Sequence, residues 1–314
     1  MSGPPTVGAA DGPTGGGLSF GLTVPDALAA DWPRWSATGG LGRIARDVED
    51  AGFDAVSVTD HPLPPARWLR HGGHHSLDPF VALATFAAAT TRLRLLTNVL
   101  VLPYRNAATT AKALATLDAV SDGRLVVGAA VGYLQAEFEV VDADFAARAA
   151  TFESTLTSMR RVWAGEVADH EARPSPSRSS GIPVWVGGNS GAARRRAATL
   201  AEGWMPFQQD PTMATVTGTA PLDDGEVLAA AIGDVHRRRT EAGRTGPFDV
   251  CFAPGHDSAL LRSDASADEV DETVERLVGA GVTWISIPSR AADHGALLAE
   301  LDFYSARLLR DRRR

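Results

Sequence analysis

The chain of 314 residues contains a single cysteine, Cys251, and no run of apolar residues long enough to cross a membrane. A lone cysteine rules out an internal disulfide and is typical of the reducing cytoplasm, where we expect this protein. A membrane-spanning helix needs about 20 consecutive apolar residues. The net charge of −8 argues against nucleic-acid binding, which normally requires a basic face. We therefore expect neither a nucleic-acid nor a membrane partner.

The N-terminus lacks the basic segment and the hydrophobic segment of a signal peptide. Residues 1–17 are instead rich in Gly, Pro, Ala and Thr, a composition that predicts a disordered leader. We expect one folded domain over residues 18–310. The sequence contains neither a Gly-x-Ser-x-Gly elbow nor a Walker-type phosphate loop, which argues against hydrolase and kinase classes.

Strand and helix patterns alternate along this predicted domain. Residues 41–58 and 276–287 share one order, in which a helix pattern ends at a glycine and a β-branched strand follows. Strands are predicted at 18–24, 52–58, 93–101, 125–131, 184–186, 203–206, 249–253 and 282–287. Eight such units predict an α/β fold of the (β/α)8 TIM-barrel type, with a doubly wound open sheet as the alternative. The polar segments 62–77, 173–181 and 208–224 are expected to be loops that carry substrate specificity.

The turn Gly187-Gly188-Asn189-Ser190 joins a predicted strand to an Ala/Arg-rich helix. A strand, a glycine turn and a helix start direct backbone N–H groups toward one point at the positive end of a helix dipole. Asn189 or Ser190 is suited both to cap the helix and to donate to a phosphate oxygen. The pattern therefore predicts a phosphate site. The alternative is a well-capped strand-to-helix turn without a ligand.

Asp60 and His61 directly follow the second predicted strand, which places them at the catalytic rim of a barrel. Histidine transfers protons near neutral pH, and an adjacent carboxylate can orient it or stabilise its charge. The alternative is a polar strand end stopped by Pro62. Arg105 and Asn106 are predicted at the same rim, where they could bind an anion or a carbonyl; the alternative is that Tyr104 and Arg105 merely cover the barrel edge. Gly132, after the fourth strand, permits close approach of the backbone to a ligand.

Histidines 71, 74 and 75 are separated by glycines but have no cysteine or acidic partner at the spacing of a zinc site. We therefore predict a loop without a metal. Cys251 falls within a predicted strand, so we expect a small buried side chain.

At these residues the chain resembles the bacterial-luciferase-like flavin and deazaflavin oxidoreductases, above all the branch that uses coenzyme F420. The resemblance covers about residues 18–301. It rests on Ala51-Gly52-Phe53-Asp54 with Thr59-Asp60-His61, on Asp78-Pro79-Phe80, on Lys112 to Asp118 with Gly123-Arg124, and on Val184 to Ser190. It implies a (β/α)8 barrel with an insertion between strands four and five, commonly assembled as a homodimer.

The resemblance also implies roles for individual residues. Asp60 and His61 would be catalytic and face the deazaflavin ring, with His61 donating or accepting a proton during hydride transfer. Asn98-Val99 matches a position where the family often has a non-proline cis peptide that backs the ring. The positions that would contact the cofactor are His61, Asn98, Val99, Val131, Gly132, Gly187, Gly188, Asn189 and Ser190. Where some sugar-phosphate dehydrogenases of the family carry Glu, this chain has Tyr133, which argues against a sugar-phosphate substrate.

The activity implied is F420-dependent hydride transfer between the deazaflavin C5 and a small organic substrate. Two alternatives stay open. One is an FMN-dependent luciferase-like monooxygenase, which uses oxygen, reduced FMN and a partner flavin reductase. The other is a flavin-binding barrel without turnover, although a degenerate site would be expected to lose Asp60 and His61 first. Fold analogy alone does not fix the chemistry.

Overall fold

Eight parallel strands close into one barrel in the computed structural model, which describes residues 17–211, 214–215 and 219–309. The strands are β1 Ser19–Thr23, β2 Ala55–Val58, β3 Arg94–Val101, β4 Leu125–Ala130, β5 Val184–Gly187, β6 Gly203–Met205, β7 Asp249–Phe252 and β8 Trp284–Pro288. Pairing of β1 with β8, for example Gly21 with Ser286, closes the sheet. The (β/α)8 TIM barrel is thus confirmed, and the open doubly wound sheet is excluded. Residues 1–16 of the predicted leader lie outside the described residues.

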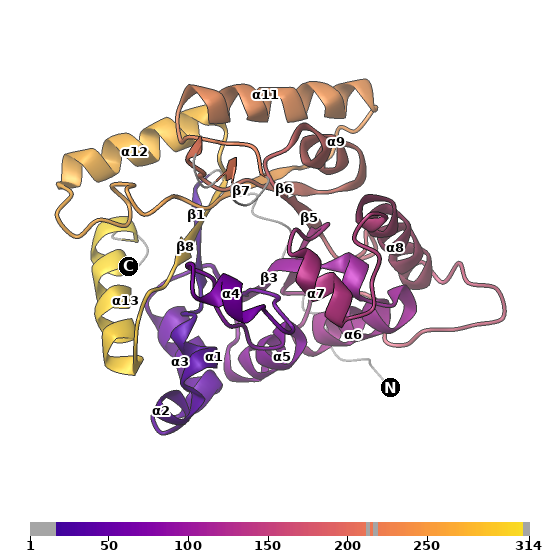
Figure 1. Cartoon of the computed structure of the whole chain (residues 1–314), viewed down its shortest axis with the longest axis horizontal. Helices are drawn as coiled ribbons and strands as arrows, with labels where there is room; N and C mark the ends of the chain where they lie inside the picture. Colours follow the sequence, from indigo (N-terminus) through magenta and orange to yellow (C-terminus); the bar gives the residue numbers. More distant parts are fainter. Residues whose placement is uncertain (1–16, 212–213, 216–218, 310–314) are drawn as a thin grey trace, which may run out of the picture.

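Helices surround the barrel, and Figure 1 shows them packed on its outer face. They are α1 Ala27–Ala30, α2 Trp32–Ser36, α3 Gly40–Asp50, α4 Ala66–Leu69, α5 Pro79–Ala89, α6 Ala107–Val120, α7 Gln135–Val140, α8 Arg148–Trp163, α9 Gly191–Leu200, α11 Glu226–Glu241, α12 Ala267–Ala280 and α13 His294–Leu308, with a 3₁₀ turn at Leu102–Tyr104. Helices α7 and α8 and a loop over residues 164–183 form the predicted insertion between β4 and β5. Among the described residues, no helix combines the length and the apolar character needed to cross a membrane.

Local capping chemistry explains several of the helix boundaries. Helix α12 begins at Ser266, whose hydroxyl accepts from the Glu269 N–H, while the Glu269 carboxylate accepts from the Ser266 N–H. This reciprocal pair satisfies two N–H groups that the first turn leaves without helical partners. The helix ends at Gly281, which adopts φ of +100°. A left-handed residue there stops the helix and directs the chain into β8, as the sequence pattern predicts.

Two apolar layers hold the barrel together. The larger lies between the strands and the surrounding helices, and the smaller fills the barrel interior. The interior layer consists of Ala55, Leu96, Val126, Trp185, Met205, Cys251 and Trp284. The rings of Trp185 and Trp284 lie 5.5 Å apart between centroids. Cys251 is buried among these side chains, as expected from the sequence, and burial raises the pKa of its thiol.

Gly203 leaves room for Trp185 inside the barrel, which yields a stability prediction. A Cβ at residue 203 would lie 2.3 Å from Cδ1 of Trp185. We expect Gly203→Ala to lower the free energy of unfolding by about 1–3 kcal/mol, because overpacking forces a shift of the indole or backbone. Urea denaturation measures this change. In the control Gly279→Ala, the new methyl meets nothing within 4 Å on α12, so equal stability of both variants would contradict the packing argument.

Candidate active site

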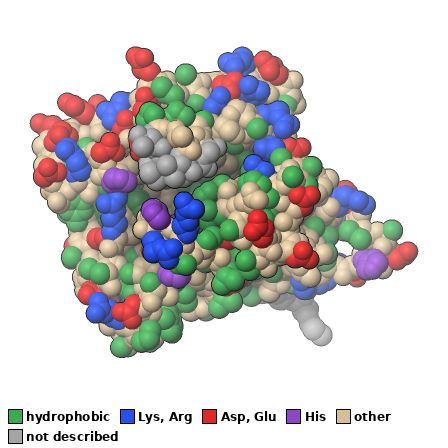
Figure 2. Space-filling model, viewed as in Figure 1, with side chains coloured by type: hydrophobic (Ala, Val, Ile, Leu, Met, Phe, Trp, Pro, Cys, Tyr) green, Lys and Arg blue, Asp and Glu red, His purple; other side chains and the backbone are tan. Residues whose placement is uncertain are grey.

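A cavity of about 770 Å³ opens at the carboxyl ends of the strands. Figure 2 shows this face, where histidine, arginine and hydrophobic side chains gather near the centre. The residues predicted to be catalytic or to bind the cofactor all line the cavity: Asp60, His61, Asn98, Val99, Val131, Gly132, Gly187, Gly188, Asn189 and Ser190. The barrel thus brings together segments that follow β2, β3, β4 and β5, which is how this fold builds active sites.

His61 is held by a carboxylate that the sequence analysis did not identify. Its Nδ1–H donates to Oε2 of Glu137 over 3.0 Å, and Glu137 is buried. The same carboxylate accepts from the Leu63 N–H and from the Tyr104 hydroxyl. Fixing Nδ1 in this way leaves the opposite ring nitrogen of His61 for the cavity that it lines.

Glu137 lies four residues beyond Tyr133, in the first turn of α7. The position at which some sugar-phosphate dehydrogenases of the family carry Glu is Tyr133 in this chain. A glutamate thus reaches His61 from the next turn of the chain, although residue 133 itself is a tyrosine. A glutamate within a short helix after the fourth strand is the signal that could have found it.

Asp60 serves a different partner from the one expected. Its Oδ2 accepts from the Val101 N–H over 2.9 Å, and its Oδ1 accepts from the Arg105 guanidinium over 2.7 Å. Burial raises the pKa of Asp60, and Arg105 opposes that rise. The arrangement anchors the end of β3 to the end of β2. It corrects the expectation that Asp60 orients the His61 ring, since Glu137 does so.

Arg105 and Asn106 also have structural contacts. The Arg105 guanidinium lies 4.8 Å from the centre of the Phe80 ring while it pairs with Asp60. The Asn106 Oδ1 accepts from the Ala108 and Thr109 N–H groups and so caps α6. Neither residue is among those that line the cavity. Arg105 therefore covers the barrel edge, as the alternative had it, and Asn106 caps a helix.

Three aromatic rings pack near His61, and two of them, His74 and Tyr133, line the cavity. Its ring centroid lies 4.6 Å from that of Trp68, 4.9 Å from that of His74 and 6.3 Å from that of Tyr133. Burial and the carboxylate of Glu137 raise the pKa of Tyr133 to about 12, so its hydroxyl stays protonated at neutral pH. Trp68 and His74 come from the segment 62–77, one of the loops expected to carry specificity.

The three histidines of that loop are not placed as a cluster. His71 is exposed, whereas His74 lines the cavity. No group of three or more His, Cys, Asp or Glu within the described part of the chain is arranged to hold a metal ion.

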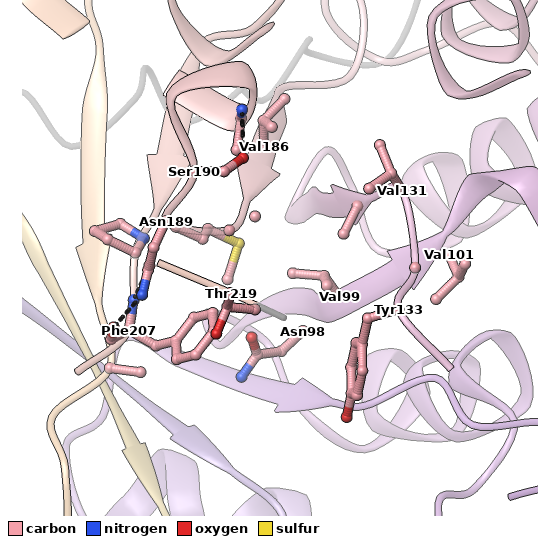
Figure 3. A pocket seen from close by; sticks show the side chains of 18 of the residues that line it. Asn98, Val99, Val101, Val131, Tyr133, Val186, Asn189, Ser190, Phe207 and Thr219 are labelled. Carbon is pink, nitrogen blue, oxygen red and sulfur yellow. Dashed lines mark hydrogen bonds between the residues drawn. The ribbon is translucent and has the colours of Figure 1, made fainter. Parts of the chain in front are cut away.

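The backbone at Asn98-Val99 has the form that the resemblance implies. The peptide bond between these residues is cis, and the pairing of β3 with β4 shifts register between Thr97 and Leu100. The Asn98 amide donates to the Thr23 hydroxyl over 3.0 Å, which fixes the side chain across the barrel mouth. In Figure 3, Ser190 and Tyr133 lie on opposite sides of the cavity, with Val99 between them in this view.

The Gly187–Ser190 turn forms the other side of the cavity. Ser190 caps α9, because its hydroxyl accepts from the Ala193 N–H over 3.1 Å. The Asn189 side chain is buried and already engaged, since it donates to the Phe207 and Ala220 carbonyls and accepts from the Phe207 N–H. The capping role thus falls to Ser190, and the Asn189 side chain has no atom left for a phosphate. The first-turn N–H groups of α9, like those of any α-helix, have no acceptor within the helix itself.

Two arginines that the sequence pattern did not single out also line the cavity. They are Arg196 of α9 and Arg148 at the start of α8. Arg196 is 6% exposed, and its Nε donates to Glu153 over 2.8 Å. Arg148 lies over the Phe145 ring at 3.9 Å from its centre. Arg196 stands three residues after Ala193, another lining residue, so both share one face of α9; the sequence run Arg194–Arg196 does not show which arginine faces inward.

His74 gives the site a testable pH dependence. Burial, with smaller contributions from His61 and His75, lowers the pKa of His74 to about 4. Between pH 6.5 and 4 the unfolded chain therefore holds a proton at His74 that the native protein does not, so native stability falls as the pH falls through this window. We expect a loss of roughly 2–3 kcal/mol from this group, measured by urea denaturation at pH 7, 6 and 5.

In the variant His74→Gln, the free energy of unfolding should no longer show this part of its fall as the pH is lowered. The control His71→Gln changes an exposed histidine and should keep the fall. Asp26, whose carboxylate lies 4.0 Å from His74, contributes the opposite slope because its pKa is raised to about 6. The difference between the pH dependence of His74→Gln and that of the wild type therefore gives the contribution of His74 apart from that of Asp26. An unchanged slope in His74→Gln would show that His74 is protonated alike in both states.

Comparison with known proteins agrees with this geometry. The sequence profile of the luciferase-like monooxygenases matches residues 20–269. The chain belongs to this family. An uncharacterised protein of Mycobacterium tuberculosis is 28% identical over 227 residues, covering 66% of this chain and 74% of that protein. An F420-dependent glucose-6-phosphate dehydrogenase of Microbacterium testaceum is 28% identical over 230 residues, 69% of this chain and 65% of the relative.

Solved structures share the fold at low sequence identity. A monooxygenase from Streptomyces bottropensis superposes with a TM-score of 0.71 at 18% identity, covering 93% of this chain and 99% of that one. An F420-dependent secondary alcohol dehydrogenase gives 0.69 at 16% identity, covering 93% and 98%. The family and these relatives place the protein among oxidoreductases, as the sequence predicted.

Proposed function

We propose that the protein is an F420-dependent oxidoreductase that transfers a hydride between the deazaflavin C5 and a small organic substrate. The observation that carries this proposal is the arrangement of the cavity. The His61–Glu137 pair stands on the β2 side, the N-terminus of α9 with Arg196 stands on the β5 side, and Arg148 of α8 lines the same cavity. A proton-transfer group and an anion site are thus three strands apart at one barrel mouth.

The cavity fits a cofactor of this kind. Its volume of about 770 Å³ lies within the range of small-molecule sites. At Gly132, which has φ of +80°, a Cβ would lie 2.7 Å from Val101 and 2.8 Å from Phe138, so the packing of the cavity wall and the backbone conformation both favour glycine. Gly188, with φ of +109°, is likewise a position that favours glycine. When bound, the deazaflavin would supply the two-electron hydride chemistry.

The protein's own residues would supply binding and proton transfer. His61 would give or take a proton through its cavity-facing nitrogen, and Glu137 would fix the tautomer and stabilise the imidazolium. Val99 and the Asn98-Val99 bulge would support the flat face of the cofactor. The N–H groups after Ser190 and the two arginines would bind its phosphate and anionic tail.

The charge of the β5 side favours F420 over FMN. Coenzyme F420 carries carboxylates beyond its phosphate, whereas FMN ends at the phosphate. Arg148 and Arg196 both line the cavity, and although Arg196 is paired with Glu153, the two guanidinium groups together with the N-terminus of α9 offer more than one contact to an anionic cofactor. Relatives named F420-dependent support the same choice. The family name and the monooxygenase neighbour favour the alternative, an FMN monooxygenase.

A titration decides between them. Purified protein is titrated separately with F420, FMN and FAD, followed by fluorescence and calorimetry, and oxygen uptake is recorded with reduced FMN. We expect micromolar F420 binding, clearly tighter than FMN binding, and no coupled oxygen uptake. Tighter FMN binding together with oxygen-dependent product formation would replace the proposal by the monooxygenase.

Neighbouring arginines on α9 provide a matched test of the cofactor side. Arg195 and Arg196 both pair with Glu153, but only Arg196 lines the cavity. We expect Arg196→Gln to weaken F420 binding about tenfold or more, since a charge-assisted contact is worth at least 1.4 kcal/mol in a partly dry site. Arg195→Gln should leave the dissociation constant within about twofold of wild type. Equal effects of both changes would mean that the arginines act only through Glu153.

A further inference from the structure

We propose that Arg67 and Arg70 form a cationic entrance at the mouth of the cavity, which speeds the association of an anionic cofactor but does not hold the cofactor once it is bound. The proposed function places a cofactor in this cavity, and the inference rests on that placement. It adds how the cofactor enters. F420 and FMN are both anionic, so the entrance serves either of them.

The short helix α4 is fixed at the rim of the cavity, and Figure 1 shows it over one end of the barrel. The segment that contains α4 runs from His61 to His74, and both of these residues line the cavity. The Trp68 ring of α4 lies 4.6 Å from the His61 ring and 5.2 Å from the His74 ring, measured between centroids. A Cβ at Gly73 would lie 2.4 Å from the Trp68 ring, so the returning chain packs closely on the indole. These contacts hold α4 beside the mouth.

The two arginines flank this anchored tryptophan. Arg67 directly precedes Trp68, and Arg70 is the C-cap of α4. Both side chains are exposed, and residues three positions apart are neighbours on one helix turn. Figure 2 shows arginine and histidine side chains gathered near the centre of this face. Two positive charges therefore stand together beside the entrance.

Neither charge is neutralised by a neighbour. Within the described part of the chain, the guanidinium groups of Arg67 and Arg70 form no hydrogen bond and no ion pair. Exposed arginines elsewhere do pair, as Arg43 does with Asp47 and Arg276 with Asp224. The carboxylates near the rim have other neighbours, namely Asp60 with Arg105, Glu137 with His61 and Asp26 with His74. An approaching anion thus meets the field of two unpaired cations.

This local field opposes the charge of the whole molecule. The net charge of −8 repels an anion on average, so an anionic ligand needs a favourable path to the cavity. Charge of one sign at a cleft concentrates ligands of the opposite sign and raises their association rate. Arg148 and Arg196 line the cavity itself, so positive charge is present both at the rim and inside.

The position of the two rim arginines predicts an effect on the rate of entry and little effect on release. Neither Arg67 nor Arg70 lines the cavity, and both side chains face solvent. Exposed charges at a rim contribute little to the stability of a bound state but act on a diffusing ion when the salt concentration is low. The rate constant for association should therefore depend on them, and the rate constant for dissociation should not.

Stopped-flow fluorescence with F420 tests the entrance on the purified full-length protein. We expect Arg67→Gln/Arg70→Gln to lower the association rate constant about three- to tenfold at roughly 10 mM salt. The dissociation rate constant should change by less than about twofold. At about 1 M salt, where charges are screened within a few ångströms, variant and wild type should associate at rates within about twofold of each other.

Two controls separate the entrance from a change in total charge or in local packing. Arg46→Gln/Lys112→Gln removes two exposed cations from α3 and α6 that do not line the cavity, so the association rate constant should stay within about twofold of wild type. The riboside precursor of F420 has the deazaflavin ring without the phosphate and the tail. Its association should respond less to Arg67→Gln/Arg70→Gln than that of F420.

Each contrary result has a distinct meaning. An equal fall in the Arg46→Gln/Lys112→Gln control would overturn the entrance, because total charge would then explain the effect. Faster dissociation with unchanged association would also overturn it and make the two arginines part of the binding site. If FMN binds and F420 does not, the choice of F420 fails, and FMN with riboflavin as the uncharged probe tests the entrance. If neither cofactor binds, the proposed function and the entrance fall together.

Discussion

Replacement of His61 by alanine is expected to lower kcat by about 10²–10⁴-fold, with the dissociation constant of the cofactor little changed. The imidazole is held at Nδ1 by Glu137 over 3.0 Å and lies against the cavity with its other nitrogen. Its removal takes away the group that moves the proton, while the anion-binding turn on the β5 side stays intact. Steady-state kinetics and a cofactor titration on the same preparation measure the two effects.

Two further variants define the role of His61. His71→Ala removes an exposed histidine of the same region and should leave kcat within about twofold. Glu137→Gln keeps the size of the side chain but not its charge, so kcat should fall, because the imidazole loses the carboxylate that fixes its orientation. If His61→Ala retains turnover within a few-fold of wild type, His61 is only part of the cavity wall.

Replacement of Asp60 by alanine is expected to lower the free energy of unfolding by about 3–5 kcal/mol. The carboxylate is buried and binds both the Val101 N–H and the Arg105 guanidinium. Its loss leaves a mostly buried cation without a partner and a buried N–H without an acceptor. Urea denaturation of both proteins, followed by circular dichroism, measures the difference.

The control for Asp60→Ala is Asp31→Ala, which breaks an exposed pair with Arg34 and should cost less than about 1 kcal/mol. Asp60→Asn keeps an acceptor for the Val101 N–H and should fall between the two. A normally stable Asp60→Ala protein that has lost turnover would restore the catalytic role expected from the sequence and would refute the anchoring role.

The order of the elements and the place of the cavity followed from the sequence alone. Apolar periodicity, the glycine after α12 and the Gly187-Gly188 turn are local signals, because each depends on neighbouring residues only. Once eight strands alternate with helices, the residues after each strand must lie at one rim. Asp60, His61, Gly132 and Ser190 were therefore predicted to meet in one cavity, and they do so.

The partners of these residues were decided by the tertiary structure. His61 and Glu137 are separated by 76 positions, and Asp60 and Arg105 by 45, so no local pattern links them. The sequence does not show that His61 contacts Glu137 while Asp60 pairs with Arg105. These pairings depend on how distant segments, the insertion among them, pack over the rim.

The same holds for the cofactor side. The sequence shows three consecutive arginines, but the packing of α9 against β5, β6 and α11 directs Arg196 into the cavity and keeps Arg195 on the surface. Asn189 looked available for a phosphate, yet the chain after β6 engages its whole amide. Contacts between distant segments are set by the packing of the barrel, and local propensity carries no information about them.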